Sequence, residues 1–165
     1  MIKKLLGIVV LGLLWCNISF AELITLTKCF YTDFNEKSSY GIESFSYKNF
    51  NEQKSDPSVM YENKLVTLDT VVETITVTTI NKDSFIKKMR DVDTIVPKYN
   101  KYIFKITDLG GNVATGELID HEGIDVITDR IDVDFESNKV YGLRHIRIGD
   151  GEIKNTSTQQ CIRQK

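Results

Sequence analysis

Residues 64–80 read KLVTLDTVVETITVTTI, and this segment decides the fold. Val, Ile and Thr fill most of its positions; such β-branched side chains pack well on a pleated sheet and fit helices poorly. The pair Asp69-Thr70 interrupts the run, so we expect two strands joined by a turn. Alternation of apolar and polar residues recurs along most of the chain, which predicts a mainly β protein.

Similar β-type sequences lie on both sides of this segment. One hairpin is expected around Gly110-Gly111, because paired glycines supply the positive φ angles of a tight turn. In a second hairpin, a three-residue loop at 137–139 would place Asp132 opposite Arg144. Besides the two strands in 64–80, the expected strands are 23–31, 102–107, 113–118, 130–136, 140–148 and 157–162, with a further one near 40–47.

The expected fold class is therefore mainly β, with about eight antiparallel strands and at most one short helix. That helix is expected within 81–90, capped by Asn81 or Asp83, whereas 49–57 has the composition of a loop. Helices do not alternate with strands, which argues against a parallel α/β sheet. Two architectures remain open, a single up-and-down barrel and a two-sheet β-sandwich.

The first 21 residues have the three-part layout of a secretory signal peptide. Lys3 and Lys4 precede an apolar stretch over 5–15, and the small residues Ser19 and Ala21 stand three and one positions before a possible cut at Glu22. The leader resembles those of small exported proteins of Gram-negative bacteria. We expect cleavage after Ala21, which leaves 22–165 as one β-rich domain, periplasmic or secreted, with no stable membrane span. The alternative is an uncleaved leader that anchors the chain to a membrane.

Removal of the leader leaves two cysteines, Cys29 and Cys161. In an oxidising compartment an even pair is most simply a disulfide. The bridge would bring the first and last strands side by side, as a closed barrel requires, and it therefore favours the barrel over the sandwich.

The charge balance argues against a general nucleic-acid binder. The chain has 21 basic and 23 acidic residues. The leader takes two lysines with it, so the remainder is more acidic and lacks the basic surplus that phosphate backbones attract. There is no glycine-rich phosphate loop, and no cofactor is expected.

Two groups of residues are candidates for a site. Asp120, His121, Glu122 and Asp125 could ligate a metal ion, but they do not match the spacing of an EF-hand or a zinc helix, and a solvated turn is the interpretation that the neighbouring alternation favours. Aromatic residues among polar ones can line a ligand mouth or partner surface, or can cap the end of a small core. These candidates are Tyr40, Phe45, Tyr47 and Tyr61.

Taken together, the sequence predicts a non-catalytic binding module for a small apolar ligand or an envelope protein. One alternative is a hydrolase that uses carboxylates of 120–134, with His121 as a further group. Another alternative is a structural component of the envelope. No motif in the sequence identifies a ligand or a nucleophile.

Overall fold

The computed structural model describes residues 23–39, 41–118, 125–148 and 150–164, with the side chains of 125–127 and 148 left out. Nine strands and two short helices lie within these ranges. They are β1 (Leu23–Ser38), β2 (Gly41–Phe45), α2 (Phe50–Ser55), β3 (Tyr61–Asp69), β4 (Thr74–Asn81), α3 (Asp83–Arg90), β5 (Tyr99–Gly110), β6 (Val113–Leu118), β7 (Asp125–Asp134), β8 (Lys139–Ile148) and β9 (Gly151–Arg163).

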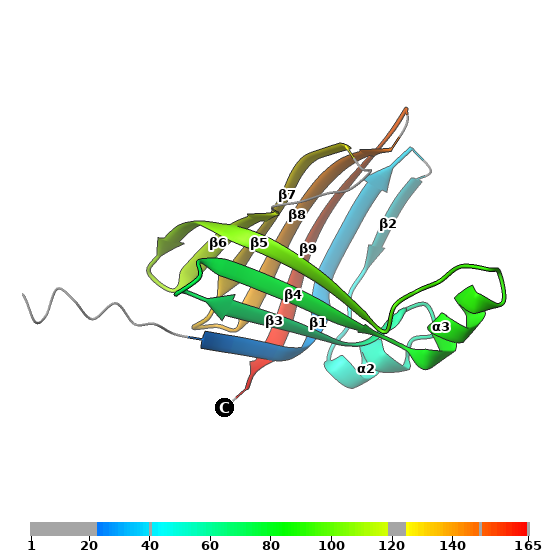
Figure 1. The fold of residues 1–165 in the computed structure, drawn as a ribbon, viewed down its shortest axis with the longest axis horizontal. Helices are drawn as coiled ribbons and strands as arrows, with labels where there is room; N and C mark the ends of the chain where they lie inside the picture. Colours follow the sequence, from blue (N-terminus) through cyan, green and yellow to red (C-terminus); the bar gives the residue numbers. More distant parts are fainter. Residues whose placement is uncertain (1–22, 40, 119–124, 149, 165) are drawn as a thin grey trace, which may run out of the picture.

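The strands form a closed barrel (Figure 1). Each strand from β3 to β8 pairs antiparallel with the next one along the chain, and β9 returns to pair with β1. Eight strands close the barrel, and β2 is an additional strand on the edge of β1. The expected up-and-down barrel is confirmed, and the two-sheet sandwich is excluded.

Strand β1 is long because it serves two neighbours in succession. Its first residues, Leu23–Leu26, pair with β3, and its last five pair with β2. Between them the register against β9 shifts, and Lys28 adopts a positive φ of 51°. At this bulge β1 leaves β3, so its backbone lacks a strand partner on that side.

The helix α2 occupies the gap between β1 and β3. Gln53 is only 1% exposed; its side-chain oxygen accepts from Tyr31 N at 2.7 Å, and its amide donates to Cys29 O at 3.3 Å. The side chain thus replaces a strand partner of β1. The structure therefore has one helix more than the sequence predicted, because a loop over 49–57 could not hold Gln53 in this position.

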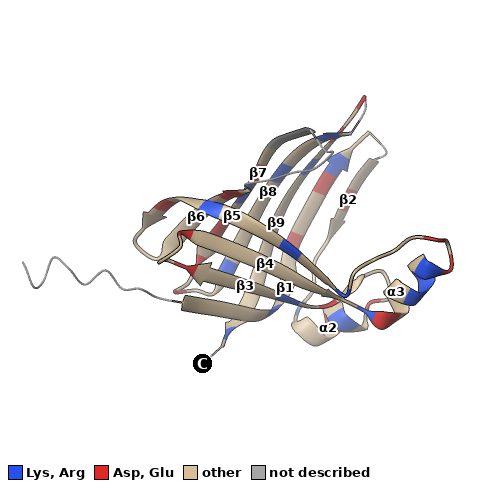
Figure 2. Cartoon of the chain, viewed as in Figure 1, with Lys and Arg blue, Asp and Glu red and all other residues tan. Residues whose placement is uncertain are grey.

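The second helix, α3, is the one that the sequence predicted, but its start differs. It begins at Asp83 after Lys82, which makes no side-chain capping bond. Asn81 instead belongs to β4 and donates to Pro97 O at 2.8 Å. Figure 2 shows basic residues grouped on α3, whereas those of the barrel are scattered along the strands.

The register of the second predicted hairpin was wrong. Asp134 pairs with Lys139, so the loop has four residues rather than three, and Arg144 lies opposite Asp129. The reason is local: the Asp134 carboxylate accepts hydrogen bonds from Glu136 N, Ser137 N and Ser137 Oγ, and Asn138 has φ 56°. These bonds stabilise a longer turn that strand alternation alone does not reveal.

One half of the barrel is filled by apolar side chains. Gly116 makes this packing possible, since a Cβ there would lie 2.9 Å from Phe104 Cβ and 3.1 Å from Ile75 Cδ1. The disulfide Cys29–Cys161 lies in the same core, with a Cα–Cα distance of 4.1 Å, and is confirmed. The remaining core residues are Ile24, Leu26, Val66, Leu68, Val77, Ala114, Ile131, Val133 and Val140.

Candidate functional site

The other half of the barrel is polar and contains a cavity. On each strand, every second side chain points into the barrel. These inward positions hold apolar residues in the packed half and charged residues in this half. Lys64 precedes Val66 on β3, Asp129 precedes Ile131 on β7, and Arg144 lies two residues after Gly142 on β8. Charged side chains on three strands therefore point into one space.

That space is a cavity of about 200 Å³. Its apolar wall includes Val77, Phe104, Ile131 and Val140, which belong to the core cluster. Polar and aromatic side chains line the rest. They are Tyr31, Phe34, Lys64, Thr79, Tyr102, Asp129, Arg144, Asn155, Ser157 and Gln159, with Arg130, Gly142 and Leu143 also contributing.

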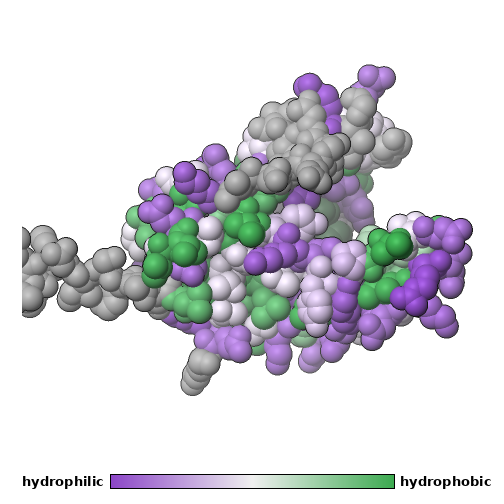
Figure 3. Space-filling model, in the orientation of Figure 1, coloured by the Kyte–Doolittle hydropathy of each residue, from purple (hydrophilic) through white to green (hydrophobic). Residues whose placement is uncertain are grey.

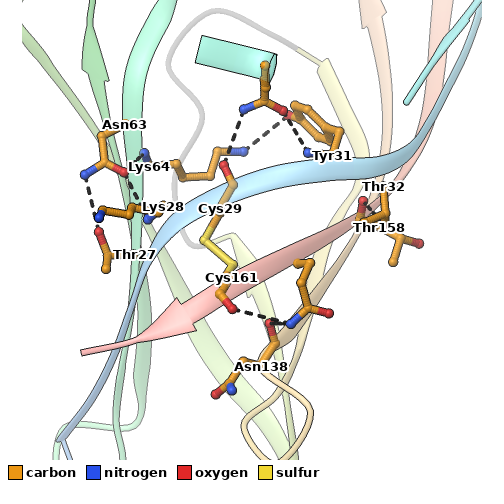
Figure 4. The surroundings of a disulfide bond; sticks show 12 residues. Thr27, Lys28, Cys29, Tyr31, Thr32, Asn63, Lys64, Asn138, Thr158 and Cys161 are labelled. Carbon is orange, nitrogen blue, oxygen red and sulfur yellow. Dashed lines mark hydrogen bonds between the residues drawn. A yellow bond between two sulfur atoms is a disulfide. The ribbon is translucent and has the colours of Figure 1, made fainter. Parts of the chain in front are cut away.

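Lys64 is the most unusual of these residues, because it is only 8% exposed. Its ammonium donates to the Tyr31 hydroxyl at 3.2 Å and lies 4.9 Å and 5.5 Å from the ring centroids of Tyr31 and Tyr61. Figure 4 shows the Lys64 side chain extending toward Tyr31. Within the described part of the chain, Lys64 forms no ion pair with a carboxylate.

The pKa values of the Tyr31 and Tyr61 phenols are shifted in opposite directions. Burial opposes ionisation of Tyr31, but the charge of Lys64 and its hydrogen bond outweigh this and hold the Tyr31 pKa below its usual value. For Tyr61, burial and the neighbouring Tyr31 phenol both raise the pKa. The charge of Lys64 is thus felt mainly at Tyr31.

Arg144 and Asp129 form an ion pair across β7 and β8. The Asp129 carboxylate accepts from Arg144 Nη2 at 2.7 Å and from Nε at 2.8 Å, and its side chain is 6% exposed. The guanidinium also lies 5.9 Å from the ring centroid of Tyr102. Two donors to one carboxylate fix both side chains against the cavity wall.

Gln159 leaves a polar atom unsatisfied in the cavity. The residue is 5% exposed, and its side-chain oxygen is buried without a hydrogen-bond partner in the described structure. It lies opposite Tyr31 across β1 and β9. Buried polar atoms nearly always have a partner, so this oxygen is a candidate acceptor for a group that enters the cavity.

Gly142 keeps the cavity open. It pairs with Ser157, and a Cβ at this position would lie 2.7 Å from Ser157 Oγ. A larger residue would push into the space that the cavity occupies.

The predicted site residues lie partly elsewhere. Asp120, His121 and Glu122 fall outside the described residues, as does the side chain of Asp125, whose backbone begins β7. Among the residues that the structure describes, no group of three or more His, Cys, Asp or Glu side chains could hold a metal ion.

None of the described aromatic candidates lines the cavity, although Phe45 and Tyr61 contact residues that do. Tyr40 lies outside the described residues. Phe45 stacks on Phe34 with centroids 4.4 Å apart and packs against Tyr47 at 5.7 Å, while Tyr61 faces Lys64. The aromatic residues that do line the cavity are Tyr31, Phe34, Tyr102 and Phe104, none of which was a candidate from the sequence.

A sequence signal for the missed polar residues does exist. Lys64, Asp129, Arg144 and Gln159 each stand in phase with inward apolar residues of the same strand. A charged residue in that phase is unusual, because burial of a charge costs free energy unless it is paired. Which of these residues come together in the barrel, however, depends on the register of the strands.

The comparisons with known proteins give little further information. No protein-family model and no curated protein matches this chain. A solved structure of the vaccine antigen transferrin-binding protein B from Haemophilus parasuis Hp5, in a single-residue mutant, is similar at a TM-score of 0.44 and 10% identity. The match covers 88% of this chain but only 27% of that antigen, and a likeness this weak carries no argument about function.

Proposed function

We propose that this chain is an exported, non-catalytic binding module that holds a small molecule in the polar half of its barrel. The observation that carries the proposal is the cavity itself. One half of the barrel is packed, whereas the other half has about 200 Å³ of space beside buried Lys64 and the unpaired oxygen of Gln159. A space lined by an apolar wall and a few buried polar groups is the usual form of a small-molecule site.

The cavity favours binding over hydrolysis. Asp129 is the one carboxylate residue that lines it among the described residues, and Arg144 already holds that carboxylate in an ion pair. A two-carboxylate mechanism needs a second acidic group within reach of the same substrate. The apolar wall suits the apolar body of a ligand, in keeping with the ligand expected from the sequence.

Native mass spectrometry of the protein purified from its own compartment tests this function. We expect a retained small molecule on the wild type and none on Gly142→Leu, whose side chain would fill the cavity. A wild-type protein that carries no ligand and binds none from a metabolite extract would contradict the proposal. The same sample tests export, because cleavage after Ala21 predicts the intact mass of a chain that begins at Glu22.

Docking to an envelope partner is a second candidate, with a separate observation behind it. Val71 and Val72 in the β3–β4 turn, and Leu109 and Val113 beside the β5–β6 turn, are exposed apolar residues. Apolar surface gathers at this end of the molecule in Figure 3. No described helix is long and apolar enough to cross a membrane. Crosslinking in intact cells from a photoreactive residue at position 72 tests this candidate, and a lack of crosslinked protein would count against it.

A further inference from the structure

The charge of Lys64 has no counter-ion in the described structure. Its ammonium carries three N–H groups, and the Tyr31 hydroxyl accepts one of them. The rings of Tyr31 and Tyr61 add cation–π attraction but no negative charge. Since a buried, unpaired ammonium is costly, an anion beside Lys64 would be strongly favoured.

The remaining charges of the cavity determine how many negative charges the site accepts. Arg144 is neutralised by Asp129 at 2.7 Å. Arg130 alternates to the outer face, where it pairs with Asp132 at 3.1 Å. One positive charge, that of Lys64, is therefore left over. A ligand with one negative charge balances it, whereas a dianion such as a phosphate monoester would place a second charge against a neutral ion pair.

The size and walls of the cavity define the rest of the ligand. About 150 Å³ is enough to hold a benzene ring, so the 200 Å³ found here suits one ring or a short chain with a small acidic group. Phe104 and Ile131 offer an apolar surface to that body, and Tyr102 lies on the same wall.

We infer that the ligand is a small monocarboxylate with an apolar body of about one ring, an inference that depends on the binding function proposed above. Its carboxylate accepts hydrogen bonds from Lys64 Nζ and from the Tyr31 hydroxyl, whose proton is not used in accepting from Lys64. The unpaired oxygen of Gln159, opposite Tyr31, accepts a bond from a hydroxyl or amide group of the same ligand.

Matched pairs of acids and amides test this inference. Phenylacetate, 4-hydroxyphenylacetate and butyrate are each titrated against their primary amides by calorimetry at neutral pH, with the full exported chain. We expect at least one acid to bind ten or more times more tightly than its amide. In Lys64→Met that preference should vanish while binding of the amide is retained, and Lys64→Gln serves as a second variant if Lys64→Met does not fold. Lys101→Met, which removes an exposed lysine from the same barrel, should leave the preference unchanged.

The possible outcomes separate the inference from the function on which it depends. If no acid binds more tightly than its amide, or if the preference survives in Lys64→Met and Lys64→Gln, the monocarboxylate inference is wrong. If native mass spectrometry then still finds a molecule that Gly142→Leu does not retain, the binding function stands without it. If Gly142→Leu binds every probe as the wild type does, the cavity is not the site and both ideas fail.

Discussion

Opening the disulfide should remove a large part of the stability of this barrel. Cys29 and Cys161 are 132 residues apart in the sequence, so the bridge closes nearly the whole described chain into one loop. In the chain-entropy account, a loop of this length destabilises the unfolded state by about 5 kcal/mol. That is comparable with the entire stability of many small domains.

Urea denaturation of oxidised and thiol-reduced protein measures this difference directly. The expected difference in the free energy of unfolding is about 3–5 kcal/mol. The barrel should still close when reduced, because β1 and β9 remain paired from Leu26 to Ser38. The double variant Cys29→Ala/Cys161→Ala is the control, since reductant should not change its stability. A difference under about 1 kcal/mol in the wild type would refute the reasoning, because the bridge would then not restrict the unfolded chain as the chain-entropy account requires.

Three further changes test other parts of the fold. Gly116→Ala places a Cβ against Phe104 and should cost about 1–3 kcal/mol in urea denaturation, with wild-type stability as the contradicting result. Gln53→Ala leaves two buried backbone groups of β1 unpaired and should cost about 1–3 kcal/mol for each; unchanged hydrogen exchange at Tyr31 N would contradict this. Burial and the hydrogen bond to Asp56 raise the pKa of Tyr47 to about 12, so stability that is complete below pH 10 should fall between pH 10 and 12, and a steeper fall in Tyr47→Phe would contradict the assignment.

Alternation along the strands was enough to predict much of the fold. The run over 64–80 gave two strands split at Asp69-Thr70, and the structure has β3 and β4 with that turn between them. The disulfide followed from compartment and cysteine number. By contrast, the residues of α2 were predicted to form a loop. The contacts of Gln53 with Tyr31 N and Cys29 O depend on the bulge of β1, which the sequence does not reveal.

The candidate site was predicted less well, for a related reason. Phe45 and Tyr61 contact residues that line the cavity, but the unusual features of the cavity are Lys64 and Gln159. Each of these looks like an ordinary polar residue in a strand until the neighbours on its inner side are known. Even the partner of Arg144 was wrong, because the loop lies at 135–138 rather than 137–139, which shifts the register by three residues and changes the pairing from Asp132 to Asp129.

The amino-acid order by itself specified antiparallel strands and a covalent link between their two ends, since side-chain alternation and cysteine count are local properties of the chain. It favoured a barrel but left the two-sheet sandwich open. Only the tertiary structure decided that one half of the barrel is packed and that the other half contains a cavity. The physical reason is that side chains on other strands determine whether a buried charge is paired. The positions of those side chains are set by register, bulges and a single helix rather than by nearby sequence.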